Sequence, residues 1–553
     1  MKRPLTNFVA LLLTSTSAFA ADPTGVNGAR VSAVVPPQEG GAIVHGMNGV
    51  GWGTADGMLY VTSDLSGTMY KIDPKTFAVS IEVPFPHGGG DDVAQAPDGS
   101  LAWTATSEGE LRYRRPGGEV QVIAHDVPGV NPVAFRADGR LVAGQVNVPG
   151  SPLFEIDPTG QKPKRIIATG ADELNSFTFG PDGLLYAPAI KVGKMVSVDI
   201  DTGARKILAE GFGRLASVKM NSKGQLIGLE SRTGRLLITD PKSGKTDHMT
   251  TLPPIVDNTA TGTDDTVYIS SPSDSAVIGI QPDFQLGRYV VNGKFSAIGG
   301  LAYVDTPQGP AVRVADDFGY RDADVLTGSV GRHPYIDDPK IPTGGSNDLA
   351  VRGDVVAVSR VRAGVVQLIA HEGRPARVIR ETKDIKTPYG IVFVADDSVV
   401  VADYSEGRLA RFDSQGVTTI AKGLAGPVGL AADGPDHVLV SEHTSGEISR
   451  VNLKTGKAQR IAKDLSQPEG LVVLADGRIV VVESGAGRVS IIDRRRGRST
   501  VVAENLSFGL KVTRTPLEVG FGAGITVGKG GELYVACDGD SSIRKIILPP
   551  KEK

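Results

Sequence analysis

The chain has 553 residues, of which 40% are hydrophobic and 22% are charged, and its formal net charge at pH 7 is −3. This length and apolar content suffice for two or more domains with buried cores. The small net charge and the lack of a long basic run exclude a nucleic-acid-binding surface. A single cysteine, Cys537, excludes an internal disulfide, so buried cores have to supply the stability.

The first twenty residues have the pattern of a secretory signal peptide. Lys2 and Arg3 are positively charged, residues 8–13 are apolar, and Ala18 and Ala20 provide the small residues of a cleavage site after position 20. The apolar stretch is too short for a membrane span, and no later run reaches about 18 apolar residues. We therefore predict a periplasmic or secreted protein without a membrane span.

A phrase of about 40 residues then recurs along the chain. Each copy has an opening residue, a short apolar strand, an Asp-Gly-type turn and a second apolar strand, as in residues 175–188. Asp-Gly between alternating strands predicts a type I′ hairpin turn, with positive φ at both central residues. The copies open at Asn48, Asp91, Asn131, Asn175, Ala216, Asp257, Gly299, Asn347, Tyr389, Val428, Glu469 and Ala523.

This period, with about four strands in each copy, predicts the blades of a β-propeller. Because propellers usually have about four to eight blades, twelve copies favour an all-β protein with two six-bladed propellers in tandem. We place the boundary near Ser296, so that residues 21–296 form the first propeller and residues 297–553 the second. The segment from Ala29 to Val35, before the first blade, is expected to supply a closing outer strand.

The opening residues are candidates for a site because the first strand of each propeller blade lines the central channel. In the first ring, two carboxylates and three carboxamides would converge on one axis. Such oxygen donors suit a hard divalent cation, Ca²⁺ above all. The predicted metal ligands are Asp91, Asn131, Asn175 and Asp257. The alternative interpretation is that Asn and Asp at these positions only cap turns.

Residues 131–139 and 175–183 resemble the blade starts of the gluconolactonase and regucalcin family, which are SMP-30-like (NHL-type) propellers. The resemblance implies a six-bladed propeller that binds one divalent metal through a Glu, two Asn and an Asp, and that hydrolyses lactones and some esters. Asn131 and Asn175 match the two asparagines, and Asp257 is a weaker match to the aspartate. The family's first-blade glutamate has no counterpart, since Asn48 stands there.

Residues 438–451 resemble instead the repeat of virginiamycin B lyase, a propeller that opens a cyclic depsipeptide ester by Mg²⁺-assisted elimination. The resemblance implies a second site built from His and Glu at strand ends. Glu442, His443 and Glu483 occupy such ends, and Glu469 opens a neighbouring blade. A carboxylate beside a histidine could serve as an acid–base pair. The simpler interpretation is that Glu442 caps a strand and His443 is exposed at a turn.

The leading hypothesis is a metal-dependent hydrolase of a small lactone or ester, with its site in the channel mouth of the first propeller. Glu230, at a strand end of the fifth blade, is a candidate proton acceptor. Two rival hypotheses stay open. One is a non-catalytic periplasmic binding or assembly protein with a protein partner on a propeller face. The other is a lyase that uses the second propeller.

Overall fold

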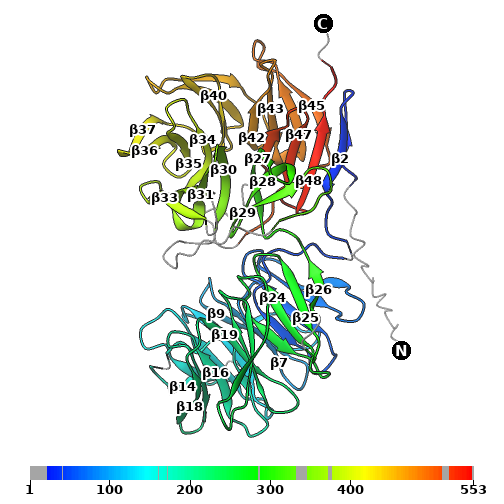
Figure 1. The fold of residues 1–553 in the computed structure, drawn as a ribbon, viewed down its shortest axis with the longest axis vertical. Helices are drawn as coiled ribbons and strands as arrows, with labels where there is room; N and C mark the ends of the chain where they lie inside the picture. Colours follow the sequence, from blue (N-terminus) through cyan, green and yellow to red (C-terminus); the bar gives the residue numbers. More distant parts are fainter. Residues whose placement is uncertain are drawn as a thin grey trace, which may run out of the picture.

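The computed structural model describes residues 21–550 except residues 40, 160, 171, 284–286, 332–344, 371–375 and 513–521. The signal peptide predicted for residues 1–20 lies outside the described residues. The described chain forms twelve β-sheets and two short 3-10 helices, η1 (Val361–Ala363) and η2 (Ser484–Ala486), without an α-helix. In the same ranges no helix has the length and hydropathy needed to cross a membrane. The prediction of two all-β propellers in tandem is confirmed (Figure 1).

Six sheets of four consecutive strands form the first propeller. Its strands are β3 (Val50–Trp52), β4 (Leu59–Ser63), β5 (Thr68–Ile72) and β6 (Val79–Val83); β7 (Val93–Gln95), β8 (Leu101–Ala105), β9 (Glu110–Arg114) and β10 (Gln121–Ala124); β11 (Val130–Phe135), β12 (Leu141–Gln145), β13 (Leu153–Ile156) and β14 (Arg165–Ala168); β15 (Thr178–Phe179), β16 (Leu185–Ala189), β17 (Lys194–Val198) and β18 (Arg205–Glu210); β19 (Leu215–Met220), β20 (Leu226–Glu230), β21 (Arg235–Thr239) and β22 (Thr246–Thr251); and β23 (Thr259–Thr261), β24 (Val267–Ser271), β25 (Ala276–Ile280) and β26 (Gly287–Asn292).

The second propeller is less regular, with a three-stranded first blade and a five-stranded fifth blade. Its strands are β27 (Ile298–Thr306), β28 (Gly309–Asp316) and β29 (Gly319–Asp324); β30 (Ser346–Arg352), β31 (Val355–Arg360), β32 (Val365–Ala370) and β33 (Arg377–Thr382); β34 (Pro388–Phe393), β35 (Val399–Asp403), β36 (Arg408–Asp413) and β37 (Gly416–Lys422); β38 (Pro427–Ala432), β39 (His437–Glu442), β40 (Glu447–Asn452) and β41 (Ala458–Ala462); β42 (Pro468–Val473), β43 (Ile479–Glu483), β44 (Arg488–Ile492) and β45 (Ser499–Glu504); and β46 (Ile525–Val527), β47 (Leu533–Cys537) and β48 (Ser542–Ile547).

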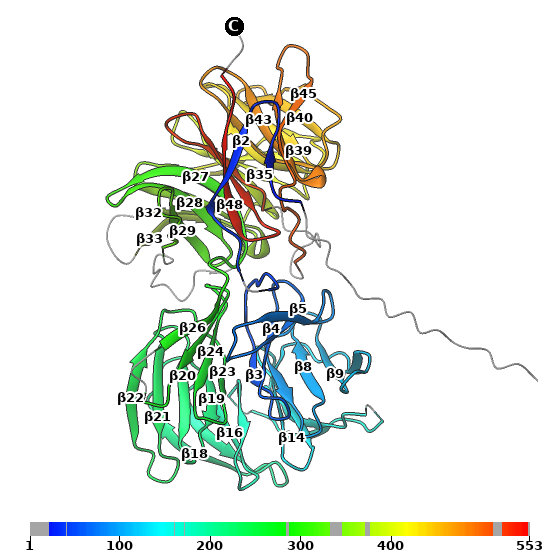
Figure 2. The same ribbon diagram turned by 90° about the vertical axis from the view of Figure 1, so that its right-hand side faces the viewer.

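The N-terminal strands β1 (Thr24–Gly25) and β2 (Arg30–Val35) belong to the second propeller, which corrects the predicted range 21–296 of the first. Strand β2 pairs with β48 and becomes the outer strand of the last blade, while β1 pairs with β45. In Figure 2 the N-terminal strand β2 lies beside β48, away from the blades that follow it in sequence. The expected closing strand therefore exists, but it closes the other propeller.

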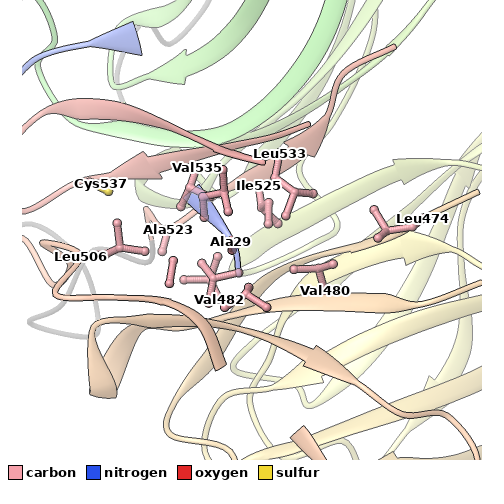
Figure 3. Packing of buried hydrophobic residues seen from close by; sticks show 14 residues of the cluster. Ala29, Leu474, Val480, Val482, Leu506, Ala523, Ile525, Leu533, Val535 and Cys537 are labelled. Atoms are coloured by element: carbon pink, nitrogen blue, oxygen red, sulfur yellow. The ribbon is translucent and has the colours of Figure 1, made fainter. Parts of the chain in front are cut away.

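Apolar cores lie between neighbouring blades. One core combines Val480, Val482 and Val489 from the fifth blade of the second propeller with Leu533 and Val535 from the sixth. Ala29, from the segment before β2, packs into the same core (Figure 3). Burial of this apolar surface explains why the N-terminal segment returns to the last blade.

The Asp-Gly turns differ in detail from the prediction. At Asp98-Gly99 only the glycine has a positive φ, +85°, and its N–H donates to the Ala96 carbonyl at 2.9 Å. The Asp98 carboxylate accepts a hydrogen bond from Ser100 N–H at 2.9 Å. The loop is thus a type I turn followed by a left-handed glycine, the three-residue hairpin loop, and not a type I′ turn.

The two propellers contact each other through the first and last blades of the first propeller and through the first blade and the 505–512 segment of the second. Leu65, which follows β4 at the end where the inner strand β3 opens, packs with Ala297, Leu510 and Val512 of the second propeller. Arg321 of β29 donates from Nη2 to the Ser273 and Asp274 loop of the first propeller's last blade. The opening end of blade 1 therefore faces the second propeller.

Candidate functional site

Residues from four blades meet at the opening end of the first propeller. Asn131, in β11, donates a side-chain hydrogen bond to the Asp91 carboxylate in the segment before β7. Asp257, before β23, interacts with Asp91 and accepts a hydrogen bond from the Asn48 side chain, before β3. Asn258 reaches the Asp91 carbonyl oxygen at 2.6 Å. The fold thus places two carboxylates and three carboxamides at one channel mouth.

Burial and neighbouring acidic charge destabilise the charged form of both carboxyl groups at this mouth. Burial and the neighbouring charge of Asp92 raise the pKa of Asp91 to about 6. Burial and the charge of Asp91 raise the pKa of Asp257 well above its usual value. Arg214, at the start of β19, partly offsets both effects. A site that raises both pKa values in this way favours a cation between the carboxylates.

Asn175, the fourth predicted ligand, has a different role. Its Oδ1 accepts a hydrogen bond from the following residue, Ser176 N–H, at 2.9 Å, and its backbone N–H donates to Pro188. In the described ranges no hydrogen bond joins this side chain to the other three predicted ligands. The turn-capping interpretation therefore describes Asn175, while Asp91, Asn131 and Asp257 lie together.

A second layer of charge lies deeper in the channel, and the sequence did not single it out. Asp92 is buried, 1% exposed, and accepts hydrogen bonds from Val93 N–H and Val133 N–H. Lys219, on β19, interacts with Asp92 and donates from Nζ to the Phe177 carbonyl at 2.7 Å. Burial lowers the pKa of Lys219. The Asp-Asp pair at 91–92 was the only sequence signal for this layer, because Lys219 lies on another blade.

The donor set at the mouth fits a hard cation. Asn131 Oδ1 is buried without a hydrogen-bond partner, which is the state of a carboxamide oxygen available to a ligand. Within the described ranges no group of three or more His, Cys, Asp or Glu side chains is suited to a metal ion. A cation here would therefore be held by two carboxylates and by carboxamide oxygens, a ligand set that suits Ca²⁺.

The proposed catalytic carboxylates Glu230, Glu442 and Glu483 bind the loop that leads into their own blade. Each accepts a hydrogen bond from a backbone N–H 17 residues earlier: Gly213 at 2.9 Å, Ala425 at 2.6 Å and Ser466 at 3.0 Å. Their remaining contacts are also internal, such as the Arg488 ion pair with Glu483 at 2.7 Å. These contacts give the three carboxylates a structural role, and we do not retain them as catalytic candidates.

His443 and Glu469 lie together at the channel of the second propeller. His443 Nδ1 is 3.9 Å from Glu469 Oε1, and the two side chains are 10% and 4% exposed, which corrects the expectation of a histidine exposed at a turn. Burial and the charge of Asp538 raise the pKa of Glu469 to about 8, and burial lowers the pKa of His443 to about 4. Glu469 and Tyr389 line a cavity of about 530 Å³.

No protein-family model and no curated protein match the chain. Among solved structures it is similar to virginiamycin B lyase from Staphylococcus aureus, at 14% identity, with 68% of this chain and 96% of that chain covered and a TM-score of 0.28. It is also similar to a chain in a nidogen/laminin complex, at 16% identity, with 42% and 90% covered and a TM-score of 0.37. A protein assigned to the gluconolactonases gives 15% identity, 49% and 95% coverage and a TM-score of 0.37.

Proposed function

We propose that the protein is an exported, metal-dependent hydrolase of a lactone or ester, with its site in the channel mouth of the first propeller. The observation that carries the proposal is the convergence of Asp91, Asn131 and Asp257 from three separate blades, joined by Asn48 from a fourth. Residues so far apart in sequence meet here only because the propeller closes, and they supply the oxygen donors that a divalent cation needs.

The residues at the mouth divide the chemistry between them. Asp91 and Asp257, with the carboxamide oxygens of Asn131 and Asn48, would hold the cation. A bound divalent cation polarises the ester carbonyl and makes water easier to deprotonate. Because a carboxylate that binds the cation loses basicity to it, the proton of the attacking water would pass to a base outside the ligand set. The water oxygen would bond to the acyl carbon, the acyl C–O bond would break, and the departing alkoxide would take the proton from that base.

The test measures calcium binding and lactone hydrolysis on matched variants. Asp257→Asn and Asn131→Ala should weaken Ca²⁺ binding in calorimetry and lower turnover together. Asn175→Ala is the control, because its side chain caps its own strand, and it should bind calcium like the wild type. Ca²⁺ at 100 times its Kd should stabilise the wild type by roughly 2.7 kcal/mol. If no divalent metal binds and no lactone or ester is hydrolysed, the non-catalytic binding protein becomes the better reading.

The His443–Glu469 pair favours a second candidate function, elimination from an ester in the second-propeller channel. With pKa values of about 4 and about 8, the imidazole is neutral and the carboxyl protonated at pH 7, so one can accept and the other donate a proton. The imidazole would take a proton from carbon and release it to water, the C–O bond would break, and protonated Glu469 would donate a hydrogen bond to the leaving carboxylate. Loss of activity in His443→Ala but not in Asp257→Asn would favour this function over hydrolysis.

A further inference from the structure

An arginine without an ion pair lies at the mouth of the first propeller. Arg214 directly precedes β19, the inner strand of the fifth blade, and its carbonyl accepts a hydrogen bond from Ser231 N–H at 3.0 Å. The residue is exposed, and among the described residues its guanidinium has no salt bridge and no hydrogen bond. This strand-opening position puts it at the same end of the channel as Asp91 and Asp257. The positive charge of Arg214 lowers the pKa of both Asp91 and Asp257, although it forms no salt bridge with either carboxylate.

Asp92, the acidic group deeper in the channel, does not need Arg214 as its cationic partner. Asp92 has its own cation in Lys219, whose Nζ is fixed by the Phe177 carbonyl at 2.7 Å. The mouth therefore contains two carboxylates and one guanidinium, and ionised together they leave one negative charge. A divalent cation between the carboxylates would reverse that sign and leave one positive charge. The cation would then balance the two carboxylates, and the positive charge of Arg214 would remain for an anionic ligand.

We propose that Arg214 binds a carboxylate of the substrate, so that the first-propeller site acts on anionic lactones or esters. This inference rests on the proposed function and names the substrate class of that site. A guanidinium suits the task because its planar N–H groups match the two oxygens of a carboxylate, and it stays charged at every relevant pH. A neutral substrate would lack this charge-assisted, two-oxygen contact.

The test uses calorimetry on the full-length protein with calcium alone, then with glucuronate and with neutral glucose in saturating calcium. Arg214→Gln should weaken glucuronate binding roughly tenfold and leave glucose unchanged. The same variant should bind calcium more tightly, because a like charge has been removed from the site. Arg214→Lys keeps the positive charge but loses the planar pair of N–H donors, so its affinity for glucuronate should lie between those of the wild type and Arg214→Gln. Lys223→Gln, exposed on the turn at the other end of β19, is the control and should match the wild type.

The outcomes separate this inference from the function on which it rests. If calcium binds normally but Arg214→Gln binds glucuronate as tightly as the wild type does, the inference is overturned and the metal site stands. Equal losses for glucuronate and glucose also overturn it, because they indicate a change of shape and not of charge. If calcium does not bind but glucuronate binding still depends on Arg214, the hydrolase proposal fails and the anion site stands.

Discussion

Replacing Glu469 with glutamine should change how the stability of the second propeller depends on pH. Burial and the charge of Asp538 raise the pKa of this carboxyl from 4.5 to about 8. A carboxyl with a raised folded-state pKa stabilises the protein fully below the unfolded pKa, and this stability is lost as pH rises through the folded pKa. The wild type should therefore lose up to about 5 kcal/mol between pH 4.5 and above pH 8 that the variant keeps.

The amide is a close match to the protonated acid, and its oxygen can still accept the Ala523 N–H, which lies 3.1 Å from Glu469 Oε2. Urea unfolding at pH 5 and pH 8.5, followed by far-UV circular dichroism, gives the free energy of unfolding. Both tryptophans, Trp52 and Trp103, belong to the first propeller, so their fluorescence reports that half separately.

The matched control is Glu447→Gln, on the neighbouring blade. Glu447 is 25% exposed and forms an ion pair with Arg460 at 2.9 Å, so its replacement should change the pH profile by less than about 1 kcal/mol. If the stability difference between Glu469→Gln and the wild type is the same at both pH values, the reasoning about the buried carboxyl is refuted.

Three further changes test the structural assignments. Glu483→Ala should lower the free energy of unfolding by about 2–4 kcal/mol, because Ser466 N–H and Arg488 lose their acceptor; lost activity at undiminished stability would contradict this. Gly390→Ala should cost at least about 2 kcal/mol in urea unfolding, because a Cβ there overlaps the Val428 carbonyl oxygen; a neutral effect would contradict the close strand approach. Removing residues 21–36 should lower the melting temperature followed by circular dichroism while tryptophan fluorescence keeps its transition; an unchanged melt would contradict the closing role of β2.

The repeat could be recognised from sequence because each blade has its own turn and its own alternating strands. Pairing between β2 and β48 could not, because residues 30–35 contain no local sign of a partner more than five hundred positions away. The turn type was misjudged because Asp98 caps Ser100 N–H in a right-handed conformation and leaves positive φ to Gly99 alone.

The candidate site, like the fold, could be predicted from the sequence only in part. Ring position brought Asp91, Asn131 and Asp257 to attention, since the opening residues of inner strands converge in any propeller. The same rule failed for Asn175, whose oxygen binds Ser176 N–H. It also missed Arg214. The opening position of the fifth blade is Ala216, which carries no polar group, and Arg214 lies two residues before it.

The pairing of β2 with β48 makes the first propeller an insertion within the second. The chain lays down one outer strand, builds six complete blades from β3 to β26, and only then adds the blades that the outer strand closes. During synthesis the first propeller can therefore finish folding while the second still waits for residues 542–547. An early strand left unpaired for that long is an exposed edge, and a matching edge on another copy could capture it.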